Sequence, residues 1–539
     1  MLEKVSLYLN TVRYMKPSQV YYRIKKKAKA EIKLKTSVAS KYEEISPIGT
    51  LRELDFDEVF LHRFPIQELI NHRITFLHQS EKFDWNGKWR KEGRSALWNF
   101  NLHYFEFLHS MTKAYLDTKK EEYLCESKRA VIGWIKNNPV EEGGDGWASY
   151  TIALRLTNWL SYWSNLQDIL EQDKDFSARM INSIYEQYVF LSKHLEKDLL
   201  GNHYFEDLKA LLLCSIFFKD SNYEYSVLRE LKKECEEQIL GDGMHFELSP
   251  MYHNIIFEGL LRVAWALRVS GRPDCELEKY IKPMADVTFS FGRAARTPLF
   301  NDGGNNVSKS VSALLDAALN RFQVHPEGKK ELTESGYYFF QEGKWQLIID
   351  AGQPGPAYIP GHSHCDAMSF ELFRDGKPVL VNCGTYAYQC KEREYFRSTR
   401  AHNTVMINCT EQSQCWGAFR LAKRSHTQVL SVSRHSITME MIDQKGQSTE
   451  RKIEIKNGKL RILDKSTNAK LTSFLHFEKE LSEKLKKSAV IIKNGNIRWD
   501  VQQYSPEFGI IKGISALEVS GNGQIDLEIE LEELYASVI

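Results

Sequence analysis

The sequence predicts an α+β protein of more than one domain, in which a helical N-terminal part precedes an antiparallel β part. The chain has 539 residues, more than one hydrophobic core usually serves. Apolar residues recur every three or four positions from about residue 60 to 320, and short alternating runs follow residue 336. We therefore expect a helical extension over residues 1–60, a helical domain over 61–325 and a β domain over 326–539.

Six segments of the helical part carry apolar residues at three- and four-residue spacing. Short polar or glycine-containing links separate them, and no repeat of fixed length is present, which argues against a solenoid. A run of antiparallel helix pairs that closes into a ring is compatible with this pattern. The six segments are residues 97–116, 151–170, 181–200, 203–218, 225–240 and 255–271.

Five later segments are rich in alternating or β-branched residues and predict strands, most simply those of a β-sandwich. Asn457-Gly458 and Asn494-Gly495 are expected to form tight hairpin turns. A cleft between the helical and β domains would be a natural ligand site. The five segments are residues 337–352, 436–443, 451–466, 489–503 and 524–534.

The charge of the chain is balanced, with 72 Lys and Arg against 71 Asp and Glu. A net charge near zero does not attract nucleic acid to the protein as a whole. An acidic substrate would therefore have to bind to local cationic side chains. No apolar run is long enough to span a membrane. The first residues do not form a secretory signal, and the nine cysteines lack CxxC pairs, which favours the cytoplasm. A periplasmic or secreted location would apply if a leader has been removed.

The stretch "GNHYFEDLKALL", residues 201–212, places an amide and an imidazole where a loop enters a helix. Asn202 could simply cap a surface helix. Alternatively, Asn202 and His203 point at a ligand, and Glu206, one turn later, orients His203.

The stretch "DGMHFELSPMYHNIIFEGLL", residues 242–261, predicts a helix that starts after Pro250. Tyr252, His253 and His245 would then lie near its N-terminus. Tyrosines are commonly half-buried packing residues. The neighbouring histidines and the helix N-terminus would instead lower the pKa of Tyr252 and make it a proton carrier.

The stretch "IPGHSHCDAMSFELF", residues 359–373, has His362, His364 and Asp366 at alternate positions. In a strand these three side chains would share one face. Asn382 and His402 fall on later segments that also look like strands. Two histidines and an oxygen ligand suit zinc, although a polar hydrogen-bond network would use the same residues.

Arginines and one tryptophan are candidates for contacts with an acidic ligand. Arg397 and Arg400 flank His402 and could bind a carboxylate or sulfate in bidentate fashion. Arg155 is a further candidate, and Trp147 could stack on a sugar ring. Solvated surface pairs for the arginines and core packing for the tryptophan are the alternatives.

Five segments in this order resemble the heparinase II/III-like family of polysaccharide lyases: "GNHYFED", "FELSPMYH", "GHSHCDAMSFEL", "LVNCGTYAY" and "RSTRAHNTVMIN". The resemblance runs from about Trp98 to Arg424. It implies an incomplete (α/α) toroid followed by an antiparallel β-sandwich. It also implies β-elimination at a uronic acid of a glycosaminoglycan such as hyaluronan, chondroitin or heparan sulfate, which leaves a 4,5-unsaturated uronate.

The resemblance also implies roles for individual residues. Asn202 would neutralise the substrate carboxylate with help from His203 or His362, and Tyr252 would carry protons. His203 or His362 would be the base, with Glu206 orienting His203. Apart from the resemblance, the residues themselves lead us to expect substrate contacts from Arg155, Arg397, Arg400, His253 and Trp147.

In family members with a metal, the ligands correspond to His364, Asn382 and His402. The family pattern has Asp where this chain has Asn382, and an amide oxygen is a poorer zinc ligand than a carboxylate. We therefore expect one structural divalent cation, either zinc or a harder ion such as manganese or calcium, with Asp366 as a further source of charge. No organic cofactor is expected.

Three other functions are compatible with the sequence. The substrate could be alginate or a bacterial exopolysaccharide. A non-catalytic polysaccharide-binding protein on the same scaffold would be expected to lose Tyr252, which this chain retains. A metal-dependent hydrolase built on His362 and His364 would lose activity on chelation and give products without a double bond.

Overall fold

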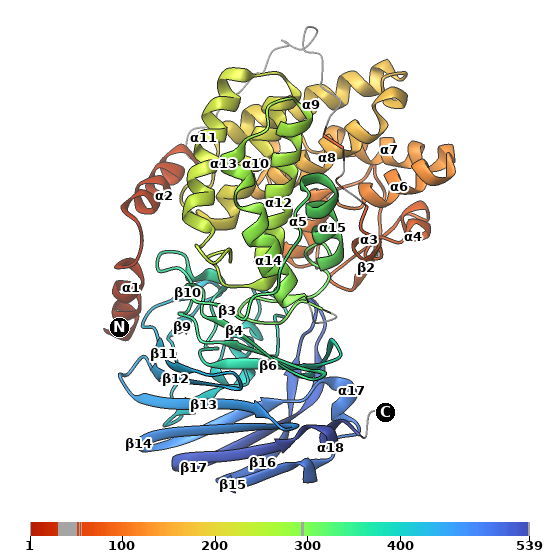
Figure 1. Ribbon diagram of the computed structural model, residues 1–539. Coiled ribbons are helices and arrows are strands. Elements are labelled where there is room, and N and C mark those ends of the chain that lie inside the picture. Colours follow the sequence, from red (N-terminus) through yellow and green to blue (C-terminus); the bar gives the residue numbers. More distant parts are fainter. Residues whose placement is uncertain (1, 31–50, 53, 55, 293–295, 537–539) are drawn as a thin grey trace.

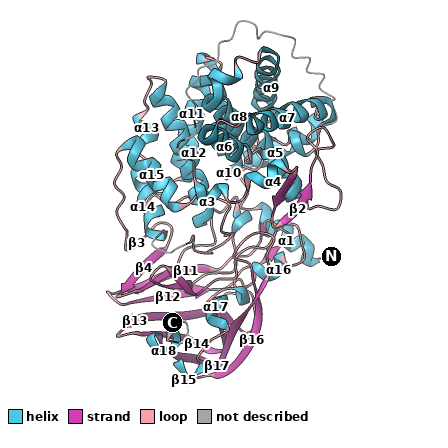
Figure 2. Ribbon diagram, turned by 90° about the vertical axis from the view of Figure 1, so that its right-hand side faces the viewer, coloured by secondary structure: helices cyan, strands magenta, loops and turns pink. Residues whose placement is uncertain are grey.

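The structure is a computed structural model that describes residues 2–30, 51, 52, 54, 56–292 and 296–536. Figure 1 shows the helical part above and the strands below, and Figure 2 shows that nearly all strands gather in one part. The predicted order of a helical part followed by an antiparallel β part is therefore confirmed. The last helix of the helical part ends at Phe322, and strand β3 begins at Glu331.

The helical part contains most of the helices and one short hairpin, β1 (Arg73–Phe76) with β2 (Gln79–Lys82). Part of the predicted N-terminal extension, residues 31–50, lies outside the described residues. The helices are α1 (Leu2–Val12), α2 (Pro17–Ala30), α3 (Glu58–Leu61), α4 (Ile66–Ile70), α5 (Ala96–Tyr104), α6 (Leu108–Thr118), α7 (Glu121–Asn137), α8 (Ser149–Leu170), α9 (Lys174–Lys193), α10 (Gly201–Phe217), α11 (Ser221–Gln238), α12 (Pro250–Val269), α13 (Cys275–Glu278), α14 (Ile281–Phe291) and α15 (Val311–Phe322).

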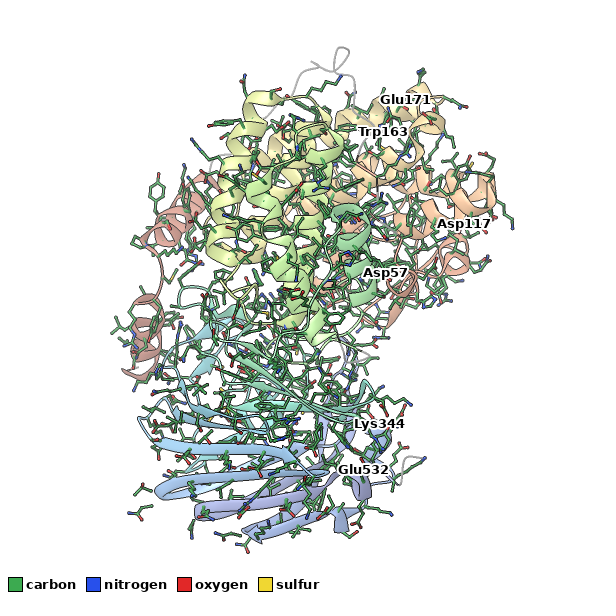
Figure 3. The ribbon with its side chains drawn as sticks, viewed as in Figure 1. Asp57, Asp117, Trp163, Glu171, Lys344 and Glu532 are labelled. Atoms are coloured by element: carbon green, nitrogen blue, oxygen red, sulfur yellow. The ribbon has the colours of Figure 1, made fainter. Side chains whose placement is uncertain are left out.

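Helix α10 is the centre of the helical part. It packs against α8, α9, α11 and α12, and almost all its side chains are buried, which fits its nearly continuous apolar sequence. The one helix predicted over 97–116 is instead two, because Phe105 adopts a left-handed conformation that ends α5. Asp57 caps α3 and also accepts a hydrogen bond from the backbone of Ser310, so it ties α3 to the start of α15 (Figure 3).

The β part is a sandwich of two antiparallel sheets. A five-stranded sheet has the order β3-β4-β5-β6-β7, and an eight-stranded sheet contains β11-β12-β13-β14-β17-β15, with β16 on β17 and β8 on β14. Both sheets contribute to one apolar core. The strands are β3 (Glu331–Leu332), β4 (Tyr337–Glu342), β5 (Trp345–Asp350), β6 (Ser369–Arg374), β7 (Lys377–Leu380), β8 (Val405–Ile407), β11 (His426–Val432), β12 (Ser436–Ile442), β13 (Ser448–Lys456), β14 (Lys459–His476), β15 (Val490–Asn494), β16 (Asn496–Tyr504) and β17 (Lys512–Glu530); β9 (Cys415–Trp416) and β10 (Arg420–Leu421) form a separate hairpin.

Shorter helices also occur among the strands: α16 (Arg393–Phe396), α17 (Lys479–Ser482) and α18 (Leu531–Tyr535). Helix α18 occupies the end of the strand predicted over 524–534, where three glutamates start a helical turn. Glu532 on α18 accepts a hydrogen bond from the indole of Trp345, next to Lys344 in Figure 3.

One of the two predicted hairpin turns is confirmed. Asn457 and Gly458 both have positive φ angles, and Lys456 pairs with Lys459 across the turn. The prediction at Asn494-Gly495 is wrong, because β15 and β16 do not pair with each other. They pair with successive halves of β17, which is long enough to accept both.

All nine cysteines are free thiols, as expected from their spacing. None of the described helices is long and apolar enough to cross a lipid bilayer.

Candidate active site

The polar residues singled out in the sequence meet where the helical part faces the β part. The beginnings of α10 and α12 come from the helical part, and the 3-10 helix η3 (Pro360–His362) comes from the loop between β5 and β6. Asn202 on α10 lies against His362 of η3, so two segments 160 positions apart share one site. Tertiary packing, and not local sequence, brings them together.

His362 is held between a carboxylate and an amide. Its Nδ1–H donates to Oδ2 of Asp302 over 2.8 Å, which leaves the lone pair on Nε2. Asn202 Nδ2 lies 3.3 Å from that Nε2 and also donates to both oxygens of Glu247, at 3.2 and 3.0 Å. The side chain of His362 is 13% exposed, and its Nε2 can accept a proton once the Asn202 amide moves away.

Gly201 permits the approach of α10 to Glu247. Its φ of +58° is a left-handed conformation, and a Cβ atom would collide with Oε1 of Glu247 and with Ile359. The backbone N–H of Asn202 can therefore donate to Glu247 over 3.1 Å. Asn202 lies in the first turn of α10 and does not cap it, because the cap position is Leu200.

Tyr252 lies in the first turn of α12, and the helix starts at Pro250 as predicted. Ser249 caps this turn by accepting from the backbone N–H of Tyr252. The phenol ring packs against the imidazole of His362 at an interplanar angle of 33°, with ring centroids 3.9 Å apart, and its hydroxyl lies 2.7 Å from that of Tyr388.

The predicted direction of the pKa of Tyr252 is wrong. Burial, followed by the proximity of Tyr388 and Asp302, raises this pKa well above its ordinary value. Tyr252 is therefore a protonated phenol at neutral pH. It can give up a proton only to a strongly basic atom.

His203 pairs with Glu196 and not with Glu206, so the predicted orienting role of Glu206 is wrong. Nδ1 of His203 lies 2.8 Å from Oε2 of Glu196. Burial disfavours the charged imidazole, but the Glu196 carboxylate outweighs burial and raises the pKa of His203. Glu206 is fully buried and pairs with Lys209 on its own helix. Glu206 follows His203 by three residues but its carboxylate contacts Lys209. The loop before α10 places Glu196 next to His203 instead.

Asp302 contacts more of the site's polar side chains than His362 alone, and the sequence analysis did not identify it. Besides His362, it accepts from Nε2 of His364 over 2.8 Å and forms an ion pair with Arg393. Burial opposes ionisation, but Arg393 outweighs it and lowers the pKa of Asp302 well below its ordinary value. Asp302 therefore stays ionised and keeps both imidazoles in fixed tautomers.

Sequence reasoning missed three further residues of the site. Glu247 and Tyr388 lie inside two of the family-like segments, "FELSPMYH" and "LVNCGTYAY", so their position was the available signal. Glu196 lies in a loop with no distinguishing pattern, and its role depends on the approach of the loop to α10.

Residues 362–366 do not form a strand, so their predicted common face is wrong. His362 ends η3, and β6 begins only at Ser369. His362 and His364 nevertheless converge, because both donate to Asp302. Asp366 instead accepts from the backbone of Asn301, and burial raises its pKa to about 6.

The predicted metal ligands partly fit a divalent cation. Nδ1 of His364 and Nε2 of His402 face each other at 3.3 Å, and two nitrogen ligands of a tetrahedral zinc ion would lie about 3.3 Å apart. Asp302 supports His364 from behind, as carboxylates support metal-bound imidazoles. Oδ1 of Asn382 accepts from the backbone of Asn403 and keeps one lone pair.

Asn382 is the weakest of the three predicted metal ligands. Among the described residues, no group of three or more His, Cys, Asp or Glu side chains is arranged to hold a metal. Asn382 follows β7, and His402 follows the 3-10 helix η4 (Thr399–Ala401). The prediction that both residues lie in strands is therefore wrong.

The two halves of the chain both match the sequence patterns of one family. The pattern "Heparinase II/III N-terminus" covers residues 2–329, and the pattern "Heparinase II/III-like, C-terminal" covers residues 324–526. The chain belongs to the heparinase II/III family. The resemblance identified from five short segments is thereby confirmed over nearly the whole chain.

Relatives of this heparinase II/III family protein carry the name heparin-sulfate lyase. The lyase of Pedobacter heparinus is 24% identical over 430 residues, covering 72% of this chain and 62% of the relative. That of Bacteroides stercoris is 24% identical over 419 residues, covering 67% and 60%. The chain thus spans less than two thirds of the length of these relatives.

Solved structures show the same fold. The crystal structure of heparinase III has a TM-score of 0.69 at 15% identity and covers 89% of this chain and 85% of that chain. A mutant of the heparan sulfate lyase HepC from Pedobacter heparinus has a TM-score of 0.58 at 17% identity, covering 95% and 87%.

Four side chains predicted to bind substrate are buried and engaged elsewhere in this heparinase II/III family protein. Arg155 donates to Gln187 and to the carbonyls of His103 and Gly146. The Trp147 indole donates to the carbonyl of Asn138.

His253 and Arg397 are likewise committed to the fold. His253 Nδ1 accepts from the backbone of His245, and burial lowers the pKa of His253 to about 3. Arg397 donates to the carbonyl of Ser363, between the two site histidines. The structure therefore contradicts substrate contact by these four residues, because their polar atoms are bonded to other parts of the fold. Arg400 is partly exposed but pairs with Glu518 on β17.

Proposed function

We propose that the protein is a polysaccharide lyase that cleaves uronic-acid-containing glycosaminoglycans by β-elimination. The observation that carries this proposal is the contact between a protonated tyrosine, Tyr252, and an imidazole, His362, whose other nitrogen is fixed by Asp302. Membership of the heparinase II/III family and relatives named heparin-sulfate lyase support it. An acid and a base side by side are the minimum that elimination needs.

The reaction removes the C5 proton of a uronate and expels the oxygen on C4. The C5 proton is only weakly acidic while the carboxylate is charged, so the negative charge that builds on the carboxyl group must be stabilised. A second group must protonate the leaving oxygen. Water takes no part, unlike in glycoside hydrolysis, which uses a pair of carboxylates. The Glu247 and Asp302 carboxylates of this site are buried and hydrogen-bonded to Asn202 and His362.

His362 is the proposed base. Asp302 accepts its Nδ1–H and so directs the lone pair of Nε2 outward. The proton taken from C5 would form an imidazolium that the ionised Asp302 stabilises. Asn202 then has to release Nε2, and its amide N–H is free to turn toward the substrate carboxylate.

Tyr252 is the proposed acid. Its raised pKa keeps the phenol protonated until a strongly basic oxygen develops on C4. Tyr388, 2.7 Å from the hydroxyl of Tyr252, can accept a hydrogen bond from it and orient it.

His203 is proposed to help Asn202 neutralise the uronate. Its raised pKa favours the imidazolium over a wider pH range than in a free histidine, which suits binding of a carboxylate better than removal of a proton. Its side chain is 37% exposed, and it follows Asn202 in the same helical turn. Of the two bases considered from the sequence, His362 is therefore favoured.

A divalent cation is proposed as a structural element held by His364, His402 and Asn382. When bound, it would accept the facing lone pairs of the two neutral imidazoles and would fix the loop that carries His362. The neutral amide of Asn382 favours modest affinity.

Ultraviolet absorbance of the conjugated alkene tests the proposal. The protein is incubated with heparan sulfate, heparin, chondroitin sulfate, hyaluronan and alginate, and the names of the relatives lead us to expect the strongest rise with heparan sulfate or heparin. A rise with alginate alone would identify the alternative substrate class. Chain shortening without absorbance would indicate hydrolysis, and binding without either change would indicate a non-catalytic protein; both would refute the proposal.

A further inference from the structure

The N-terminal arm, defined as α1 and α2 (residues 2–30), carries apolar side chains on its outer surface. Seven of the eighteen large apolar side chains that are exposed in the described part of the chain lie between residues 5 and 24. Leu9 is 67% exposed, Ile24 is 64% exposed and Val5 is 49% exposed. Val5, Leu9 and Val12 follow one another at helical spacing and so form one stripe on α1.

Other side chains of the arm attach it to the body of the protein. The Trp416 indole donates to Thr11 over 3.0 Å and packs edge-on against Tyr8, so α1 lies on the β9–β10 hairpin. On α2, Lys26 pairs with Asp198 before α10, and Gln19 is buried. Figure 1 shows the arm along one side of both parts of the molecule. The exposed stripe is therefore held outward by these contacts.

The arm is also strongly basic. Residues 1–30 contain eight Lys or Arg and one Glu, whereas the whole chain has a net charge of only +1. A second copy of the arm would bring like charges together, which disfavours self-association through this surface. An acidic polysaccharide would satisfy the cations but not the aliphatic side chains. A surface with both apolar and cationic side chains fits an anionic lipid bilayer.

We propose that the N-terminal arm docks the protein on the surface of an anionic membrane, with Val5, Leu9, Val12 and Ile24 entering the headgroup boundary and the lysines of α2 meeting lipid phosphates. Docking is peripheral and leaves the site residues on α10, α12 and η3 in the body of the protein. The arm would thus determine where the protein acts, and it would take no part in the reaction.

Cosedimentation with vesicles tests this proposal on the full chain. Vesicles of phosphatidylcholine with one quarter phosphatidylglycerol are compared with vesicles of phosphatidylcholine alone, and we expect binding only to the former and release by salt. Each Lys near an anionic surface strengthens binding roughly fivefold. Lys25→Gln with Lys27→Gln is therefore expected to weaken binding about 25-fold.

The aliphatic contribution has a matched control. Leu9→Asp with Ile24→Asp should reduce binding at least as strongly as the lysine changes. Val501→Asp with Ile497→Asp places the same charges on β16, where Val501 is 72% exposed, and should leave binding unchanged. Thermal unfolding and alkene formation should be the same in all variants, because these residues lie outside the site.

Three outcomes would overturn the proposal. The wild-type protein could fail to bind anionic vesicles at low salt. The Leu9 and Ile24 variant could bind as well as the wild type, which would mean that the arm attracts any polyanion through charge alone. Sedimentation velocity could instead show self-association that Leu9→Asp abolishes, which would make a second copy the partner.

Discussion

The phenol ring of Tyr252 packs against the imidazole of His362, with ring centroids 3.9 Å apart and an interplanar angle of 33°. The tyrosine comes from the first turn of α12, and the histidine comes from the loop between two strands of the β part. Each proton-transfer group is thus held by a different domain, and each has an independent support: Ser249 caps the turn of Tyr252, and Asp302 fixes His362. Variants of the two groups can therefore test separate steps.

Tyr252→Phe should lower kcat for alkene formation by roughly 10²–10⁴-fold, because the variant loses the proton for the leaving oxygen. Tyr388→Phe is the matched control, since it removes the hydroxyl that touches Tyr252 but leaves the acid in place. We expect a clearly smaller fall for it. Equal losses in the two variants, measured by initial rates of absorbance, would contradict the assignment of Tyr252.

His362→Ala should also abolish measurable turnover, while KM changes little, because the base is lost and the residues that bind the carboxylate remain. His253→Asn provides the contrast. It breaks buried hydrogen bonds to the backbone of His245 and Met284. We expect it to lower the free energy of unfolding by about 1–3 kcal/mol with kcat/KM nearly unchanged. Loss of turnover in a stable His253→Asn protein would restore His253 to the site.

Glu196→Gln should shift the pH dependence of KM. The carboxylate raises the pKa of His203 above 6.5, so the wild-type imidazole loses its charge, and uronate binding weakens, only as pH rises through that raised pKa. In the variant this rise in KM should begin at lower pH. NMR titration of the His203 ring checks the cause directly, and an unchanged His203 titration would refute it.

The same pair makes a prediction for stability. The raised pKa of His203 stabilises the fold fully below pH 6.5, and the lowered pKa of Glu196 does so above pH 4.5. The difference in Tm between the wild type and Glu196→Gln should therefore be largest between these two pH values. It should shrink as pH falls through the Glu196 pKa or rises through the His203 pKa.

Lys209→Met should destabilise the protein by about 3–5 kcal/mol, because it leaves the Glu206 carboxylate buried and unpaired. Adding Glu206→Gln to Lys209→Met should recover part of this loss. Denaturant unfolding measures both effects. If Glu206 oriented His203 after all, Glu206→Gln alone would change the His203 titration, which the structure leads us not to expect.

Zinc or manganese should raise the Tm of the wild-type protein but not that of His402→Ala, since a ligand that binds only the folded state stabilises it. Asn382→Asp should increase the shift, because a carboxylate is the stronger ligand. No Tm shift with either ion in the wild type, together with none in Asn382→Asp, would leave His364 and His402 as a hydrogen-bonded pair without metal.

The sequence predicted most of the secondary structure of the molecule because side-chain periodicity is a local property. The segments that became α8, α10 and α12 were found almost to the residue, and the Asn457-Gly458 turn formed as its φ preferences require. The failure at Asn494-Gly495 has a non-local cause: the length of β17 decides that two strands in succession pair with it. No local pattern around residue 494 contains that information.

The sequence by itself determined the order of domains, the family and the residue types of the site, since each depends on short ordered motifs. Only the tertiary structure decided which polar residues act together. It placed Asp302 between His362 and His364, exchanged Glu206 for Glu196 as the partner of His203, and buried Arg155 in the helical core. The physical reason is that hydrogen bonds and burial depend on approach in space, and these partners come from separate segments of the chain.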